Sequence, residues 1–171
     1  MKFKNLEDKI LPVKYLFTDC DGVLTDNGVY YSANGEELKR FSIRDGMAVE
    51  RLKELCQVTT GIITGEMSPS VKKRAEKLKI TELYLGAKNK VEVFYEILLK
   101  NKIQYHEVAY IGDDCNDEEL LKLVGFAACP SDGLIYAKRH ADYVCTLPGG
   151  HGCFRELAEL IIEYKLKTLS T

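Results

Sequence analysis

The 171-residue sequence lacks several features that would assign it to particular classes of protein. Its net charge is -2, whereas domains that bind nucleic acid usually carry a basic face. No apolar run approaches the ~20 residues that a membrane-spanning helix needs. The N-terminus, MKFKNLEDKILP, is charged and lacks the apolar core of a signal peptide. We therefore expect a cytoplasmic protein whose partners are neither nucleic acids nor membranes.

Paired cysteine motifs are also missing. The six cysteines include no CxxC pair, and most of them stand in or beside apolar segments. Without a signal peptide, such residues are expected to be free and mostly buried thiols rather than disulfides or zinc ligands. They are Cys20, Cys56, Cys115, Cys129, Cys145 and Cys153.

What the sequence does contain is an alternation of short apolar runs with longer amphipathic stretches. The runs are apolar on both faces, as parallel strands covered by helices on both sides must be. One of the intervening helices is expected to begin with Ser68 as its N-cap and Pro69 in its first turn. The pattern predicts an α/β protein with a doubly wound parallel sheet, in one domain over residues 1–171. The predicted strands are 13–19, 58–64, 83–86, 108–113, 126–130 and 143–146.

One segment, 28–42, interrupts this alternation. Two short strand-like pieces flank Ala33-Asn34-Gly35, and Asn-Gly at such a place favours a tight turn. We expect a β-hairpin that projects just after the first strand.

Polar residues follow the predicted strands at the points where these end. Ligands in open α/β sheets bind at the carboxyl ends of the strands, so these side chains are expected to converge on one rim. Clustered carboxylates repel one another, and a hard divalent ion such as Mg²⁺ relieves that repulsion. The residues are Asp19, Asp21 and Gly22 after the first strand, Thr64 and Gly65 after the second, Lys90 before a helix, and Asp113, Asp114 and Asp117 after the fourth strand.

Such a set of residues suits the transfer of a phosphoryl group. Mg²⁺, Lys90 and Thr64 would surround its charged oxygens. A carboxylate can attack phosphorus to form an aspartyl-phosphate, and a second acid two residues on can protonate the leaving oxygen. Each motif alone is weak, because paired aspartates often cap a turn and a first-turn lysine is usually solvated. Their order at successive strand ends favours the catalytic interpretation.

The segments DCDGVLT, IITG and GDDCND, together with Lys90, resemble the four motifs of the haloacid dehalogenase superfamily of phosphatases. The resemblance covers nearly the whole chain. It implies that Asp19 is the nucleophile and Asp21 the general acid and base. It also implies that Asp19, the backbone carbonyl of Asp21 and Asp113 hold Mg²⁺.

The resemblance assigns supporting roles to the other motif residues. Thr64-Gly65 and Lys90 would bind phosphate. Asp114 and Asp117 would support the site, with Asp114 near the metal shell, and Gly22 would allow the sharp turn after the nucleophile.

Many members of that superfamily carry a separate cap domain, for which this sequence has no room. The hairpin and one helix use all the residues between Asp21 and the second strand. A chain of this length without a cap is similar to the 3-deoxy-D-manno-octulosonate 8-phosphate (KDO 8-phosphate) phosphatases. The resemblance implies a homotetramer in which a neighbouring subunit closes each site. It leaves the pathway open between lipopolysaccharide biosynthesis and the synthesis of a sialylated glycan.

The identity of the sugar acid stays open between eight and nine carbons. The octulosonate group often has arginine after Ile-Thr-Gly, whereas this chain has Glu66, and Lys77 follows eleven residues later. That combination resembles the phosphatases of nonulosonate 9-phosphates, the sialic-acid family, although a lysine on this helix is more often simply solvated. The segment PGGHGCFRE (148–156) resembles a Gly-Gly-x-Gly-x-x-Arg motif of the octulosonate group. Arg155 is therefore a further candidate for ligand binding, and the role of His151 is open.

Two non-hydrolytic functions compete with this interpretation. The same fold can serve as a binding module, although that role needs no carboxylate pair at Asp19 and Asp21. A response-regulator-like phosphoacceptor also has a doubly wound sheet, but its acceptor aspartate would follow the third strand. Steady release of free phosphate, as opposed to stable phosphorylation, separates these alternatives.

Overall fold

The computed structural model describes residues 6–169, without the side chains of Glu37 and Leu169. Two predictions therefore extend outside the described residues. They are the single domain over 1–171 and the charged N-terminus, which begins before residue 6. Six parallel strands form one sheet in the order β5-β4-β1-β6-β7-β8, as the doubly wound prediction requires. These strands are β1 (Tyr15–Thr18), β4 (Thr59–Ile63), β5 (Glu82–Tyr84), β6 (Val108–Ile111), β7 (Phe126–Cys129) and β8 (Tyr143–Val144).

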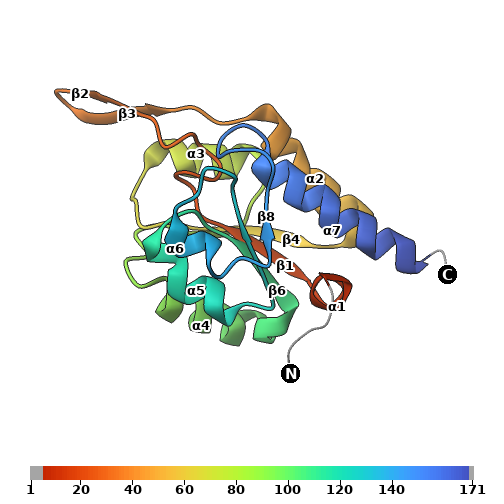
Figure 1. Cartoon of the computed structure of the whole chain (residues 1–171). Helices are drawn as coiled ribbons and strands as arrows, with labels where there is room; N and C mark the ends of the chain where they lie inside the picture. Colours follow the sequence, from red (N-terminus) through yellow and green to blue (C-terminus); the bar gives the residue numbers. More distant parts are fainter. Residues whose placement is uncertain (1–5, 170–171) are drawn as a thin grey trace.

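Helices cover both faces of this sheet (Figure 1). One core, around Leu16 and Ile62, packs against α1 (Leu6–Ile10), α2 (Ile43–Cys56), α3 (Pro69–Lys77) and α7 (Cys153–Leu169). The other core, around Phe17 and Ile63, packs against α4 (Lys90–Asn101), α5 (Glu118–Leu123) and α6 (Ile135–Lys138). Neighbouring strand residues thus point to opposite faces, which explains why the strands are apolar throughout.

The N-cap prediction for α3 is confirmed, since Ser68 accepts a hydrogen bond from the Val71 amide and Pro69 is the first helical residue. Two single-turn 3₁₀ helices, η1 (Tyr105–Glu107) and η2 (Cys115–Asp117), flank β6. The strands are shorter than predicted, and the short helices α1 and α6 were not expected. Within residues 6–169 no helix is long and apolar enough to cross a membrane.

The predicted hairpin is present as β2 (Val29–Ser32) and β3 (Gly35–Lys39), an antiparallel pair separate from the main sheet. It projects beyond the layers of helices (Figure 1). The chain then returns into α2, whose N-cap Ser42 accepts from the Asp45 amide at 3.4 Å. No cap domain follows, because β4 begins directly after α2.

The cysteines are free, as expected. Four of them are buried and Cys56 is partly so, whereas Cys115 is exposed.

Candidate active site

Asp19 follows β1 directly and is 5% exposed. Its Oδ1 accepts a hydrogen bond from the Cys20 amide at 2.6 Å, and its Oδ2 lies 2.8 Å from the Lys90 ammonium. Burial raises the pKa of Asp19 to about 8, with a further contribution from Asp117 and an opposing one from Lys90. Both carboxylate oxygens are therefore held in place by a rigid strand end and a buried cation.

Asp21 is held from two sides. Its Oδ1 accepts from the Thr25 hydroxyl at 3.1 Å, within the same loop. Its Oδ2 accepts from the Lys39 ammonium at 2.6 Å, and Lys39 is the last residue of the hairpin. Sequence reasoning missed Lys39, because only the folded hairpin brings it back to the loop.

Gly22 turns the chain between Asp21 and the hairpin, with φ of +82°. A Cβ at this position would overlap the Asp113 carboxylate and lie 2.6 Å from Nδ2 of Asn27. Glycine is therefore required here for the backbone conformation and for the close approach of Asp113. Asn27, which was also missed, donates to Asp113 Oδ2 at 3.3 Å.

The segment after β6 contributes a buried carboxylate network. Asp117 is fully buried; its Oδ1 accepts from Lys90 at 2.6 Å and from the Tyr110 hydroxyl at 2.5 Å. Its Oδ2 accepts from the amides of Asp113 and Asp114 at 3.0 and 3.3 Å. Asp117 thus fixes both the lysine and the backbone that carries Asp113.

Lys90 is the first residue of α4 and is 4% exposed. Burial alone would lower its pKa, but the carboxylates of Asp19 and Asp117 outweigh this and raise the pKa of Lys90 above its usual value. It therefore carries its positive charge at neutral pH. Tyr110 lies on β6 and was not singled out from the sequence. Its hydroxyl accepts a hydrogen bond from Lys90 at 3.2 Å.

Three buried carboxylates form a cluster that fits a hard divalent cation. Oxygens of Asp19, Asp113 and Asp117 all lie within 4.8 Å of one another. Burial raises the pKa of Asp113 to about 6, with Asn27 opposing and Asp117 and Asp114 adding to the effect. A cation would relieve this crowding of acids. The expected backbone ligand at Asp21 stays a prediction, since the cluster is one of side chains.

The second motif lies beside this cluster, because β4 is a parallel neighbour of β1. Thr64 follows β4, is 1% exposed and accepts from the Glu66 amide at 3.3 Å. Gly65 is exposed and has open space where a side chain would stand. Its backbone is therefore accessible to an anion, as the phosphate-binding prediction requires.

The specificity candidates do not all share this rim. Glu66 is exposed directly after Gly65. Lys77 is the last residue of α3 and lines a cavity of about 610 Å³ with Thr59 and Thr81, at the amino ends of β4 and β5. The structure does not bring Lys77 to the other candidates within one chain.

Arg155 and His151 have partners of their own. Nε of Arg155 lies 2.6 Å from Glu159 on the same helix. His151 Nδ1 lies 2.7 Å from the Gly149 carbonyl and its Nε2 lies 3.1 Å from Arg40. Neither contact reaches the carboxylate cluster.

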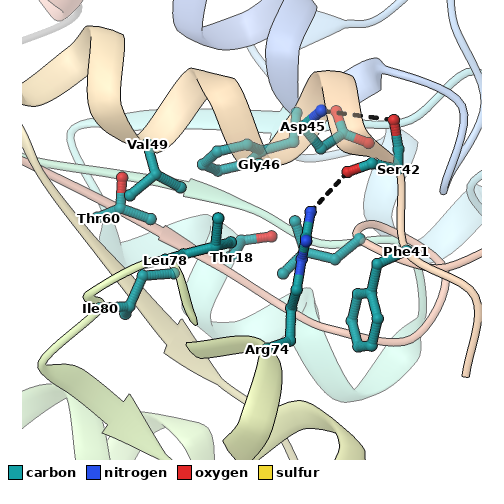
Figure 2. Close-up of a pocket in the computed structure, with 12 residues that line it drawn as sticks. Thr18, Phe41, Ser42, Asp45, Gly46, Val49, Thr60, Arg74, Leu78 and Ile80 are labelled. Carbon is teal, nitrogen blue, oxygen red and sulfur yellow. Dashed lines mark hydrogen bonds between the residues drawn. The ribbon is translucent and has the colours of Figure 1, made fainter. Parts of the chain in front are cut away.

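A small cavity lies between Thr18 of β1 and the first turn of α2 (Figure 2). Its volume of about 10 Å³ is far below the hundreds of Å³ that a sugar acid needs. Arg74 of α3 crosses it, donating to the Ser42 carbonyl at 2.8 Å and lying 5.6 Å from the centre of the Phe41 ring. Arg74 therefore anchors the segment between the hairpin and α2. The cavity is not a substrate site.

The chain is similar to known proteins in sequence and in structure. A family model described as haloacid dehalogenase-like hydrolase matches residues 36–157. The 3-deoxy-D-manno-octulosonate 8-phosphate phosphatase KdsC of Escherichia coli K12 is 38% identical over 150 residues, covering 88% of this chain and 79% of that protein. The protein of the same name from Haemophilus influenzae is 32% identical and covers 95% of this chain and 90% of its own length.

Solved structures agree closely with this fold. A Moraxella catarrhalis 3-deoxy-D-manno-octulosonate 8-phosphate phosphatase, in complex with magnesium, phosphate and KDO, has a TM-score of 0.90 and 31% identity, covering 96% of this chain and 94% of that chain. A cobalt-bound phosphatase from Haemophilus influenzae has a TM-score of 0.89 and 32% identity, with coverage of 94% and 93%. Both neighbours were solved with a divalent metal.

Proposed function

Because the chain belongs to the haloacid dehalogenase-like hydrolase family, we propose that it hydrolyses a 2-keto-3-deoxy sugar acid phosphate with the help of Mg²⁺. The observation that carries this proposal is the convergence of Asp19, Asp113 and Lys90 at one end of the sheet. The chain is a phosphatase, as its family and relatives indicate. A non-catalytic or phosphoacceptor role is not favoured.

The reaction would proceed in two steps. Asp19 attacks phosphorus, the bond from phosphorus to the sugar oxygen breaks, and an aspartyl-phosphate forms. Asp21 protonates the leaving oxygen, then accepts a proton from the water that hydrolyses the intermediate. Lys90 and the Thr64-Gly65 segment stabilise the phosphoryl oxygens. A bound Mg²⁺ would offset the charge of Asp19 and Asp113.

The relatives make the eight-carbon KDO 8-phosphate the first substrate to test. The second is a nine-carbon nonulosonate 9-phosphate, favoured by the exposed Glu66 at the rim. Phosphate release from both, with Mg²⁺ and with Asp19→Asn as the blank, tests the proposal. No release above the blank would refute the sugar-acid assignment. A tenfold preference for either substrate would decide whether the sugar acid has eight or nine carbons.

The site would be closed by a neighbouring subunit in a homotetramer. The hairpin supports this proposal because its apolar side chains face solvent, Tyr30 at 64%, Tyr31 at 71% and Leu38 at 62% exposure. Such a projecting apolar surface is typical of an interaction site. Lys77 could then reach a substrate only from another chain. Measurement of the molar mass in solution tests the tetramer, and a monomer would exclude it.

A further inference from the structure

The glycine-rich loop before α7 lies directly against the loop that follows β1, at the same end of the sheet (Figure 1). The Gly150 amide donates to the Val23 carbonyl at 2.8 Å. At Gly149, a Cβ would overlap the carbonyl oxygen of Gly22 and lie 2.6 Å from its carbonyl carbon. Since real Cβ atoms essentially never approach closer than 3.0 Å, no side chain fits at Gly149.

Gly22 in turn lies against Asp113, whose carboxylate occupies the space of the missing side chain. The three residues therefore form one stack, from Gly149 through Gly22 to Asp113. The contact between Gly149 and Gly22 involves backbone atoms, which cannot rotate away as a flexible side chain would. The partner of Gly22 in the second contact is the Asp113 side chain, whose Oδ2 accepts a hydrogen bond from Asn27 at 3.3 Å. A displacement of Gly22 therefore changes the space that is available to the Asp113 carboxylate.

The far side of the stack is also tied down. The Gly149 amide donates to Asp132 Oδ1 at 2.9 Å, and the Ser131 amide donates to the Leu147 carbonyl at 3.1 Å. The same turn after β7 returns to the site, because the Leu134 amide donates to the Asp113 carbonyl at 2.7 Å. The loop before α7 is thus tied to the turn after β7, and that turn is tied to Asp113.

We propose that Gly149 is a positioning residue of the active site, which sets the distance between the loop after β1 and Asp113. Asp132 serves the same purpose by holding the Gly149 amide. The inference rests on the proposed function for its catalytic consequence. It gives the Gly-Gly segment a role of its own, because Arg155 pairs with Glu159 and the His151 ring contacts the Gly149 carbonyl rather than the carboxylate cluster.

The test is Gly149→Ala, with Gly125→Ala as the matched control. A Cβ at Gly125 would lie 2.5 Å from the His106 carbonyl oxygen and 2.6 Å from its Cα, at the opposite end of the sheet. Both substitutions force two backbones apart, but only one does so beside the site. We expect a displacement of about 1 Å in Gly149→Ala to lower kcat/KM about 100-fold. Mg²⁺ binding, followed by calorimetry, should weaken about tenfold or more. Gly125→Ala should lower the melting temperature without either change.

Asp132→Ala provides a second variant if Gly149→Ala fails to fold, because Asp132 is exposed. Its Mg²⁺ binding should weaken, and Asp132→Asn, which keeps an acceptor oxygen, should restore it. Hydrogen exchange of amides 22–26 gives a readout that needs neither substrate nor metal, and it should accelerate in Gly149→Ala and Asp132→Ala only. Equal losses in Gly149→Ala and Gly125→Ala, or unchanged exchange at 22–26, would overturn the inference. A wild-type protein without phosphatase activity would instead refute the proposed function.

Discussion

The ammonium of Lys39, at the end of the hairpin, lies 2.6 Å from Oδ2 of Asp21. The Lys39 side chain is 1% exposed and has Glu36 as its second partner, at 3.4 Å. Glu36 accepts in turn from the hydroxyl of Ser68, the N-cap of α3. The hairpin is therefore linked by charge to the proposed acid and base, and anchored to the helix beyond it.

Lys39→Met should lower kcat about 10- to 100-fold, because Asp21 loses the partner that orients its carboxylate toward the leaving oxygen. Steady-state kinetics with the preferred sugar acid phosphate would measure this. Arg40→Met is the control, since it breaks an ion pair with Asp26 that is largely exposed and worth at most about 1 kcal/mol. Similar kcat values for the two variants would show that Lys39 does not position Asp21.

Tyr110→Phe should destabilise the protein by about 1–3 kcal/mol, because the buried Asp117 carboxylate loses a hydrogen-bond donor. Urea unfolding at neutral pH would measure the change. Tyr105→Phe is the matched control at a tyrosine that is 55% exposed, and it should cost less than about 0.5 kcal/mol. Equal effects would mean that the Tyr110 hydroxyl contributes nothing specific.

Asp113→Asn should have opposite effects on the metal-free and metal-bound protein. It removes one of three clustered buried carboxylates, so we expect the metal-free protein to melt at a higher temperature than wild type. The rise in melting temperature on addition of Mg²⁺ should disappear, together with phosphatase activity. Differential scanning calorimetry with and without Mg²⁺ provides the measurement. An undiminished Mg²⁺ effect would exclude Asp113 as a ligand.

Glu156 should make stability depend on pH. Burial opposes its charged form. Its carboxylate accepts hydrogen bonds from the Thr146 amide, the Leu147 amide and the Tyr143 hydroxyl. These hydrogen bonds outweigh the effect of burial and hold the pKa of Glu156 below the usual 4.5. Its contribution is therefore complete above pH 4.5 and is lost as the pH falls through the lower folded-state pKa.

Glu156→Gln should accordingly reduce the free energy of unfolding by about 1–3 kcal/mol at pH 7, because the amide NH₂ would face donors. The difference from wild type should shrink toward pH 3. Urea unfolding across this pH range measures it, with Glu163→Gln on the exposed face of α7 as the control. A difference that stays constant with pH would contradict the assignment to ionisation.

Much of the fold follows from local patterns. The strands around Phe17, Ile62 and Tyr110 were predicted from apolar runs, because a strand buried on both faces must be apolar at every position. Asp19, Thr64 and Asp113 were placed at strand ends because each of these polar residues stands where an apolar run ends. The carboxyl ends of neighbouring parallel strands meet, so the sequence order already brings these residues to one edge.

Other parts of the site depended on contacts that form only when the chain folds back on itself. Lys39 reaches Asp21 only after the hairpin has turned, and Tyr110 looked like an ordinary core residue until its hydroxyl met Asp117. Lys77 illustrates the converse, since its helix runs away from the site and ends at the opposite edge of the sheet.

Local sequence by itself determined which residue types stand at each strand end, because burial and backbone propensity act over a few neighbours. Only the tertiary structure decided which of those groups touch, and it decided that Gly149 has no room for a side chain against Gly22. The contact between Gly149 and Gly22 joins segments more than a hundred residues apart. Contacts of this kind are set by the packing of whole layers, which no local pattern records.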